Sequence, residues 1–455
     1  MSTSYLVPQM TMPFGARANT AQFWPDETPV YQQVLTWVLL IPLLYLVVDG
    51  QFSIANPYNS ALMTENGYLL RTAQGIRPQV ILYYLLMAVF IVSGYRKIWR
   101  VILNNKVLLL APLFAAFSAT WSESPLITFR ASLELMMTTL FAFYLTERFS
   151  TERLMKLLMF VGTVAGLLSV ILAVFLPNYG IYHRGGGAEW QGICSHKNAL
   201  GVSMAFLLTP VFYSAQRLIL KLGYAALLLF LIAMCQSRGA WFVTLGVLLF
   251  TAWLSISRRL GNKQSLLWAV ATGAAVIGMV FLGLLYLEPL LKTIGKDPTL
   301  TGRTGIYLAV LDSIFKHPFF GYGFGAFWLG LNRESLIIAL RIHWMTIGYA
   351  ENGLLELWLE LGAVGLLLVL FLFGRAIRQS VRLIRSRYYS PRVGWFSAIL
   401  FLQLITNVEA GMVMTPVTIN WTLTLIAFVG LAKEWRTRPR SESVFVSLGV
   451  KRVSL

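Results

Sequence analysis

Four basic residues stand where apolar runs begin on one side of a predicted membrane domain. Arg130 ends WSESPLITFR, Lys197 follows GICSH, Arg238 follows CQS, and Arg303 opens an amphipathic stretch in TLTGRTGIYLAVLDSIFK. A helix N-terminus carries about +0.5 charge, so a cation there costs roughly 0.3–1 kcal/mol of folding free energy. A phosphate or pyrophosphate would reverse that sign. Each side chain alone fits snorkelling to lipid headgroups, but four together indicate a shared anion site.

Hydroxyl residues next to three of these cations predict where the helices start. Ser195, Ser237 and Thr301 suit N-cap positions. In CSHKNALG, residues 194–201, Lys197 is expected to contribute to the anion site. We interpret His196 as a loop hydrogen-bonding residue rather than a ligand, and place it with Asn198 among the candidate substrate contacts.

Acidic residues gather in YAENGLLELWLELGAVG, residues 349–365. Glu351 is expected in a first helical turn, where a carboxylate is favourable as a cap and could also act as a general base for a sugar hydroxyl. Asn352 beside it is a candidate substrate contact. Glu356 and Glu360 lie one turn apart within the membrane, and structural pairing is expected for both.

Two further loops carry possible substrate contacts. YHRGGGAEWQG, residues 182–192, contains Arg184 and is interpreted first as a flexible loop and second as a substrate contact. HPFFGYGFGAFW, residues 317–328, contains Tyr322 and alternates glycine with aromatic residues. This pattern suits an aromatic belt at the membrane surface or a sugar-stacking platform.

The composition predicts an all-α polytopic membrane protein rather than a soluble enzyme. The 455 residues are 57% hydrophobic and 12% charged, and backbone groups in lipid must pair within their own segment. We predict about twelve transmembrane helices, at about 34–49, 79–94, 104–121, 130–146, 154–176, 199–216, 220–236, 240–256, 266–290, 353–373, 394–412 and 415–432.

Charge predicts the orientation. With both termini inside, 25 of the 37 Lys and Arg residues fall on the inner side, as the positive-inside rule expects. The net charge of +18 then needs no nucleic acid, because basic inner loops face anionic lipid. We expect a cytoplasmic tail over 1–33, a membrane domain over 34–432 with a periplasmic loop over 291–350, and a basic cytoplasmic tail over 433–455.

No metal or nucleotide motif is evident. The four histidines have no metal-ligand spacing among them, and the chain has no HExxH, Walker or nucleophile-elbow motif. We therefore predict neither metal nor cofactor. Cys194 and Cys235 are expected to remain free thiols rather than to pair.

Six segments, in order and spacing, resemble one known family. They are ATWSESPLITFRASL, GICSHKNALG, SRGAW, LTGRTGIY, HPFFGYGFGAFW and ENGLLELWLELGAVG. Together they resemble the O-antigen ligase and Wzy-type polysaccharide polymerase superfamily, closest to its ExoQ-like exopolysaccharide polymerase branch. The resemblance covers about residues 35–430.

This resemblance implies a bacterial inner-membrane glycosyltransferase of the GT-C class. It would join oligosaccharide units carried on undecaprenyl diphosphate at the periplasmic face, without metal, and with chain-length regulator or export proteins as further partners. Arginines matching Arg238 and Arg303 contact the diphosphate in that family, and Arg130, Arg184 and Lys197 would be outer cations. The family's ligases have His where this chain has Glu351, so either Glu351 or His343 is the expected base.

Two alternatives stay open. A ligase would transfer the glycan to lipid A or to protein instead of extending it. A lipid or solute transporter would use cationic outer sites for binding alone, but transporters tend to have matching halves and sites near the midplane. The polar residues here concentrate at the outer edge, which favours the enzyme.

Overall fold

The computed structural model describes residues 37–50, 52, 78–182, 188–260, 264, 303–328, 333–341, 348–409 and 413–438. Two compact units divide the chain, residues 1–41 and residues 42–455. The candidate site lies wholly in the second unit. The predicted tail 1–33, the predicted span 266–290 and parts of the loop 291–350 lie outside the described residues.

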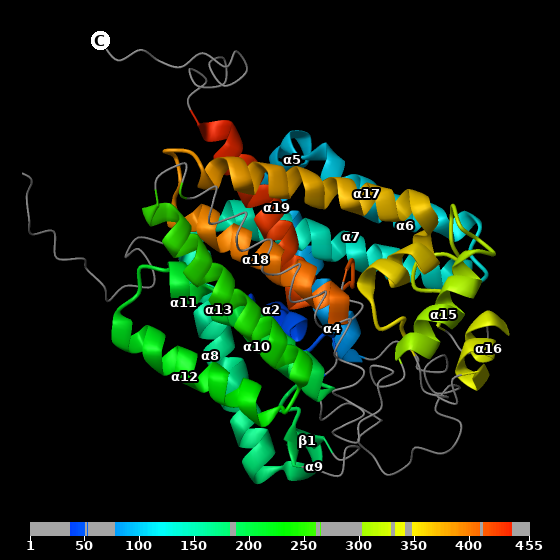
Figure 1. The fold of residues 1–455 in the computed structure, drawn as a ribbon, viewed down its shortest axis with the longest axis horizontal. Helices are drawn as coiled ribbons and strands as arrows, with labels where there is room; N and C mark the ends of the chain where they lie inside the picture. The colour runs from blue at the N-terminus through cyan, green and yellow to red at the C-terminus, as the bar shows by residue number, and fades with distance from the viewer. Residues whose placement is uncertain are drawn as a thin grey trace, which may run out of the picture. The chain divides into compact units, whose positions relative to one another are not determined.

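The regular secondary structure of the described residues is helical apart from one short hairpin (Figure 1). Its first half contains α2 (Leu40–Val47), α4 (Pro78–Ser93), α5 (Tyr95–Asn104), the 3-10 helix η3 (Lys106–Leu109), α6 (Leu110–Phe117), the 3-10 helix η4 (Ser118–Thr120), α7 (Pro125–Arg148), α8 (Thr151–Phe175) and α9 (Pro177–Gly180). The hairpin pairs β1 (Ile181–Tyr182) with β2 (Glu189–Trp190) in antiparallel register.

The second half begins with α10 (Lys197–Leu208), α11 (Pro210–Tyr213), α12 (Leu218–Met234) and α13 (Arg238–Arg259). It continues with α15 (Arg303–Ile314), α16 (Arg333–Arg341), α17 (Gly353–Ile384), α18 (Pro391–Glu409) and α19 (Ile419–Thr437). Eleven of the twelve predicted spans overlap these described helices. The remaining one, 266–290, lies outside the described residues.

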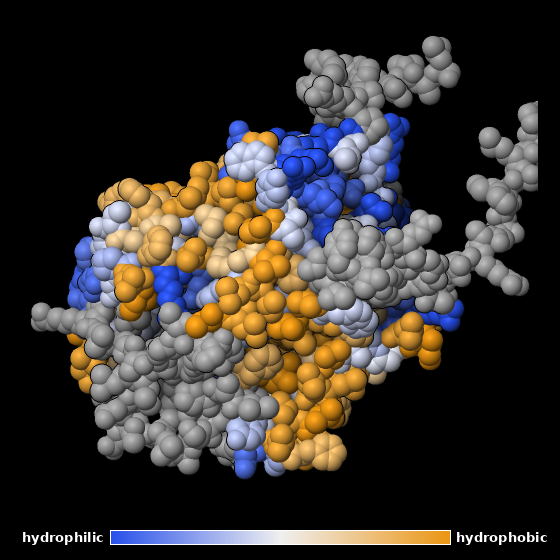
Figure 2. Space-filling view, turned by 180° about the vertical axis from the view of Figure 1, so that it is seen from behind, coloured by the Kyte–Doolittle hydropathy of each residue, from blue (hydrophilic) through white to orange (hydrophobic). Residues whose placement is uncertain are grey.

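Several helices have the length and composition of membrane spans. Among the described residues, α7, α8, α13 and α17 qualify, and α4 with α5 makes a fifth if this pair, bent by 79°, is one span. On the face shown in Figure 2, hydrophobic side chains form a broad continuous surface and hydrophilic ones gather beyond it. The all-α polytopic membrane class is confirmed, while twelve spans stay a prediction.

The helices pack into a bundle around α19, whose residues Ile419–Ala432 are all buried. α19 contacts α7, α17 and α18, and α18 also contacts α13. α15 packs against α17, and Figure 1 shows α15 and α16 gathered at the end where α17 begins. A buried apolar cluster joins α15, α16 and the 322–328 segment to the first turns of α17.

Candidate functional site

The two residues just before α17 have different roles: one is the helix cap and the other has a strained backbone. The Asn352 side-chain oxygen accepts hydrogen bonds from the backbone N–H groups of Leu354 at 3.0 Å and Leu355 at 3.2 Å. Asn352 is therefore the N-cap of α17. The predicted place of Glu351 in the first helical turn is wrong, because Glu351 lies one residue before the cap. Glu351 is 8% exposed and has φ of 54°, in the left-handed region that non-glycine residues rarely adopt.

A hydrogen bond links this strained residue to α15. The Tyr307 hydroxyl, on α15, donates to the backbone oxygen of Glu351 at 3.3 Å. Arg303 is the first residue of α15, as the sequence predicted, and lies about one helical turn before Tyr307. This hydrogen bond brings the starts of α15 and α17 together. The Arg303 side chain is not among the side chains that the structure describes.

A break inside α17 was not predicted. Gly362 has φ of 65° and ψ of −173°, and an added Cβ there would lie 2.2 Å from the backbone carbon of Phe319. The backbone N–H groups of Ala363 and Val364 donate to the carbonyl oxygens of Pro318 and Phe319, at 2.8 and 3.2 Å. The 318–323 segment thus satisfies groups that a broken helix would leave unpaired.

The 318–323 segment makes hydrogen bonds both to α17 and to Trp121. The backbone N–H groups of Tyr322 and Gly323 donate to the carbonyl oxygens of Leu359 and Glu360, at 3.0 and 2.9 Å. On the other side, the Trp121 indole N–H donates to the Phe320 carbonyl at 3.0 Å. The loop with alternating glycines and aromatics therefore packs against α17 at the break in that helix.

Tyr322 itself is 3% exposed. Its hydroxyl donates to the Ser313 carbonyl at 3.1 Å, and burial raises its pKa to about 12. The phenol is consequently neutral at ordinary pH and its proton is used within the fold. Two other aromatics of the loop, Phe319 and Phe320, are 66% and 53% exposed.

Glu356 and Glu360 have structural partners, as predicted. Glu356 accepts from the Trp328 indole N–H at 2.8 Å and from the Ala350 backbone N–H at 2.5 Å. Glu360 accepts from the Gly325 backbone N–H at 2.9 Å. Both carboxylates therefore join Gly325, Trp328 and Ala350 to the start of α17.

The residues of the CSHKN segment lie at the start of α10. Lys197 is its first residue, and its ammonium pairs with the Glu189 carboxylate at 2.6 Å. The cap is His196, whose Nδ1 accepts from the Asn198 N–H at 3.1 Å, so the predicted cap Ser195 is wrong and the histidine's hydrogen-bonding role is confirmed. Because Glu189 already neutralises Lys197, its charge is less available to a bound anion.

Arg238 opens α13 next to α10. Its neighbour Ser237 is the N-cap, accepting from the Ala240 N–H at 3.3 Å, as predicted. α10 and α13 approach closely here, since a Cβ at Gly201 would lie 2.4 Å from the Ala240 Cβ. The starts of α10 and α13 therefore lie side by side, with Arg238 exposed.

Arg130 was predicted in a first helical turn, but it lies further along its helix. α7 begins at Pro125, so Arg130 is its sixth residue rather than its first. The proline suits the first helical turn, which places the helix start earlier than the apolar run indicated. Arg130 pairs with Glu134 one turn later at 3.2 Å, with its side chain 50% exposed.

Three sequence predictions lie outside the described residues, namely His343, Arg184 and Thr301. Cys194 and Cys235 are both buried free thiols, as expected. The Cys194 thiol is within hydrogen-bonding range of the Val47 carbonyl at 3.6 Å, and burial raises its pKa.

One residue that the sequence interpretation missed is Asn407, near the end of α18. It is 4% exposed and its Oδ1 has no hydrogen-bond partner in the described part of the chain. A Cβ at Gly353, two residues after Glu351, would lie 2.6 Å from that oxygen. The available signal was an amide inside the apolar run LFLQLITNV, which has a cost in lipid unless it has a partner or a function.

Two comparisons with known proteins bear on this arrangement. The model of a family described as O-Antigen ligase (Wzy_C) matches residues 223–370, from α12 to the middle of α17. The chain is also 24% identical over 361 residues to the exopolysaccharide production protein ExoQ of Rhizobium meliloti (strain 1021), covering 74% of this chain and 79% of that protein. Together these matches confirm the resemblance of this chain to the O-antigen ligase and ExoQ-like superfamily of membrane enzymes.

Proposed function

We propose that this protein polymerises oligosaccharide repeat units carried on undecaprenyl diphosphate, at the periplasmic face of a bacterial inner membrane. The observation that carries the proposal is the junction of α15 with α17, where the Tyr307 hydroxyl holds the Glu351 backbone at 3.3 Å. It brings the start of a helix opened by Arg303 to a buried carboxylate in a strained conformation. Backbone strain of this kind concentrates at functional sites.

The reaction is a single displacement at the anomeric carbon of the lipid-linked sugar. An acceptor hydroxyl oxygen forms the new bond to that carbon while the bond from the carbon to the diphosphate oxygen breaks. The hydroxyl proton passes to Glu351 or His343, and the electron pair leaves with the lipid diphosphate. Inversion of configuration follows from one displacement, and the balance requires no oxidant and no metal ion.

The leaving group is stabilised by cations at helix starts. Arg238 and Arg303 are assigned to the diphosphate, because each opens a helix whose N–H groups and dipole also favour an anion. One well-placed donor of this kind is typically worth about 10²–10³-fold in rate. Lys197 and Arg130 are outer cations, since Glu189 and Glu134 pair with them. Arg184 completes that outer group.

Hydrogen-bonding groups near the start of α17 suit the sugar. Asn352 uses its Oδ1 as the cap, which leaves its amide nitrogen as the group assigned to substrate. We also assign His196 and Asn198, at the start of α10, to the sugar. Tyr322 has its hydroxyl committed to Ser313, so we assign it to shaping the loop rather than to direct hydrogen bonding with the sugar.

A ligase is the second candidate, because the matching family model is described as O-Antigen ligase. It would use the same leaving group and the same cations. Only the acceptor would differ, being lipid A or a protein instead of another lipid-linked repeat.

Reconstitution distinguishes these activities. The purified full chain in liposomes is supplied with lipid-linked repeat units alone, and lipid-linked products are separated on a gel. A polymerase produces a ladder of longer glycans without a second acceptor. Product that forms only after lipid A or acceptor protein is added would instead establish a ligase. Movement of intact lipid-linked substrate across the bilayer, with no lengthening, would establish a transporter.

A further inference from the structure

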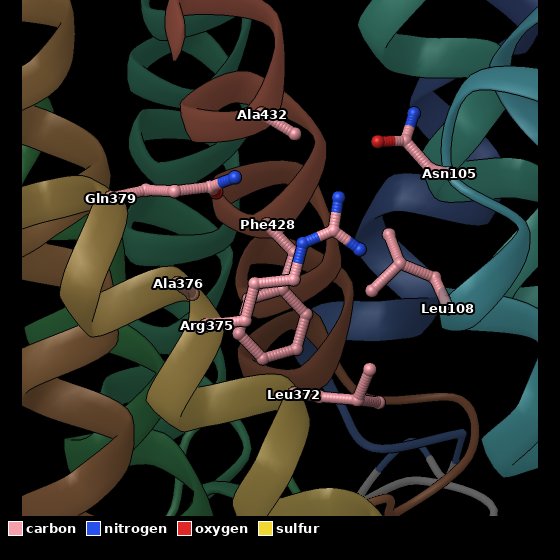
Figure 3. A pocket seen from close by; sticks show the side chains of 8 residues that line it. All are labelled: Asn105, Leu108, Leu372, Arg375, Ala376, Gln379, Phe428 and Ala432. Carbon is pink, nitrogen blue, oxygen red and sulfur yellow. The ribbon is translucent and has the colours of Figure 1, made fainter. Parts of the chain in front are cut away.

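A second cationic site lies at the other end of α17. A shallow pocket, open to solvent and with room for about one water molecule, lies between η3, α17 and α19. Figure 3 shows the Arg375 side chain extending from α17 into this space, toward Asn105 and Leu108. This end of the bundle is the one that the positive-inside count assigns to the cytoplasm.

The pocket concentrates positive charge without enough carboxylates to balance it. Within the described part of the chain, Arg375 is half-buried and has neither an ion pair nor a hydrogen bond. Arg436, on α19, is close enough to repel it electrostatically. The nearby carboxylate of Glu147 is already paired with Lys433 at 3.2 Å. The charge of Glu147 therefore acts on Lys433 as well as on Arg436.

Arg436 is held in position by the chain that lines the pocket. Its Nη1 donates to the Asn104 carbonyl at 2.8 Å and to the Asn105 Oδ1 at 3.2 Å. A guanidinium has five N–H donors. Arg436 thus keeps donors for a further acceptor while its orientation is set by two bonds.

The lining changes from polar to apolar along the membrane normal. Leu372 precedes Arg375 by about one helical turn, and Phe428 precedes Arg436 by about two. Both therefore lie deeper in the bundle than the guanidiniums, and Leu108 likewise follows Asn105 toward the membrane interior. Beside them, Phe371 is 58% exposed on the outer surface of α17. A charged opening above an apolar floor matches a lipid better than a free ion.

We propose that this pocket binds the phosphate of an anionic phospholipid of the cytoplasmic leaflet, with Arg375 and Arg436 as donors. The two guanidiniums bind the phosphate oxygens at the mouth of the pocket, and an acyl chain lies along the exposed side of α17 at Phe371, about one helical turn deeper than Arg375. Basic pockets between membrane helices on the cytoplasmic side are known headgroup sites. Phosphate binding removes the repulsion between the arginines and links α17 to α19. The proposal is independent of the reaction at the opposite end.

The test is lipid binding to the purified full chain in a neutral detergent. A short-chain fluorescent phosphatidylglycerol is titrated against the wild type, Arg375→Gln and the control Arg378→Gln. Arg378 has the same charge on the same helix but is exposed and does not line the pocket. Arg375→Gln is expected to weaken binding by about tenfold or more, and Arg378→Gln by less than about twofold.

The source of the phosphate is resolved by competition. Unlabelled phosphatidylglycerol is expected to displace the probe, while phosphatidylcholine and inorganic phosphate at millimolar concentration are not. Equal loss of binding in both variants, or displacement by inorganic phosphate alone, would overturn the proposal. If Arg375→Gln does not fold, Arg375→Lys is used, which keeps the charge but loses the two-pronged contact and is expected to weaken binding several-fold.

Discussion

Three carboxylates stand within ten residues at the start of α17, and they occupy two different environments. Glu356 and Glu360 accept N–H hydrogen bonds from Trp328, Ala350 and Gly325. Glu351 precedes the cap in a left-handed conformation, held by Tyr307 of α15.

The two environments distinguish residues that serve folding from residues that are available for chemistry. A carboxylate that completes the hydrogen bonding of a broken helix contributes to stability, because its removal leaves buried donors unpaired. A strained residue that the cap does not require persists only because its surroundings hold it there. Substitutions in the first environment should therefore lower stability, and substitutions in the second should lower activity.

The largest expected effect is on leaving-group departure. Arg238→Ala and Arg303→Ala should each lower the rate of glycan extension by about 10²–10³-fold, because charge develops on the diphosphate as its bond to sugar breaks. Initial rates in proteoliposomes measure this, with melting temperatures in detergent expected to stay unchanged. Arg385→Ala, which removes the same charge from an exposed residue after α17, is the matched control. Full-length polymer from both variants would refute the assignment.

Glu351→Gln should lower the rate by about 10²-fold while leaving the protein folded, because it removes a base but keeps the size of the side chain. The control is Glu123→Gln, which changes an exposed carboxylate just before α7. His343→Gln is measured beside it. Normal turnover in Glu351→Gln together with loss in His343→Gln would assign the base to the histidine.

Gly362→Ala tests the folding environment. The substitution forces a left-handed φ on alanine and places its Cβ against Phe319, so we expect destabilisation by about 1–3 kcal/mol. Thermal unfolding in detergent measures it. Gly374→Ala in the same helix meets no atom within 4 Å and should be neutral or slightly stabilising. Similar melting temperatures for the two variants would show that the break in α17 is not under this constraint.

The smallest effect is expected at Arg130. Its ion pair with Glu134 is half-exposed and spans one helical turn, so Arg130→Ala should change stability by less than about 0.5 kcal/mol and activity by less than about twofold. Extension rates and melting temperatures check both. A tenfold loss of activity would move Arg130 from the outer cations into the group that contacts the diphosphate.

Much of the fold followed from local patterns. Apolar runs predicted eleven helices that the described chain contains, because length and hydropathy are properties of a segment by itself. The starts of α10, α13 and α15 were also predictable, since Lys197, Arg238 and Arg303 stand at abrupt changes from polar to apolar sequence. The start of α7 was missed because Pro125 begins the helix inside the stretch interpreted as a loop.

The partners of these residues could not be predicted in the same way. Lys197 and Arg238 look alike in sequence, yet one faces Glu189 on a hairpin eight residues upstream and the other is exposed. The resemblance to a known family indicated a class of enzyme, but it contained no information about which cations are already neutralised.

The membrane class, most helix positions and the residue types able to bind an anion follow from the amino-acid sequence, because each depends on neighbouring residues alone. The folded structure was needed to show that the 318–323 segment fills a break in α17, that Tyr307 meets Glu351, and that Arg436 lies within electrostatic range of Arg375. Those contacts join residues far apart in the chain, and burial and charge pairing depend on which surfaces the bundle brings together.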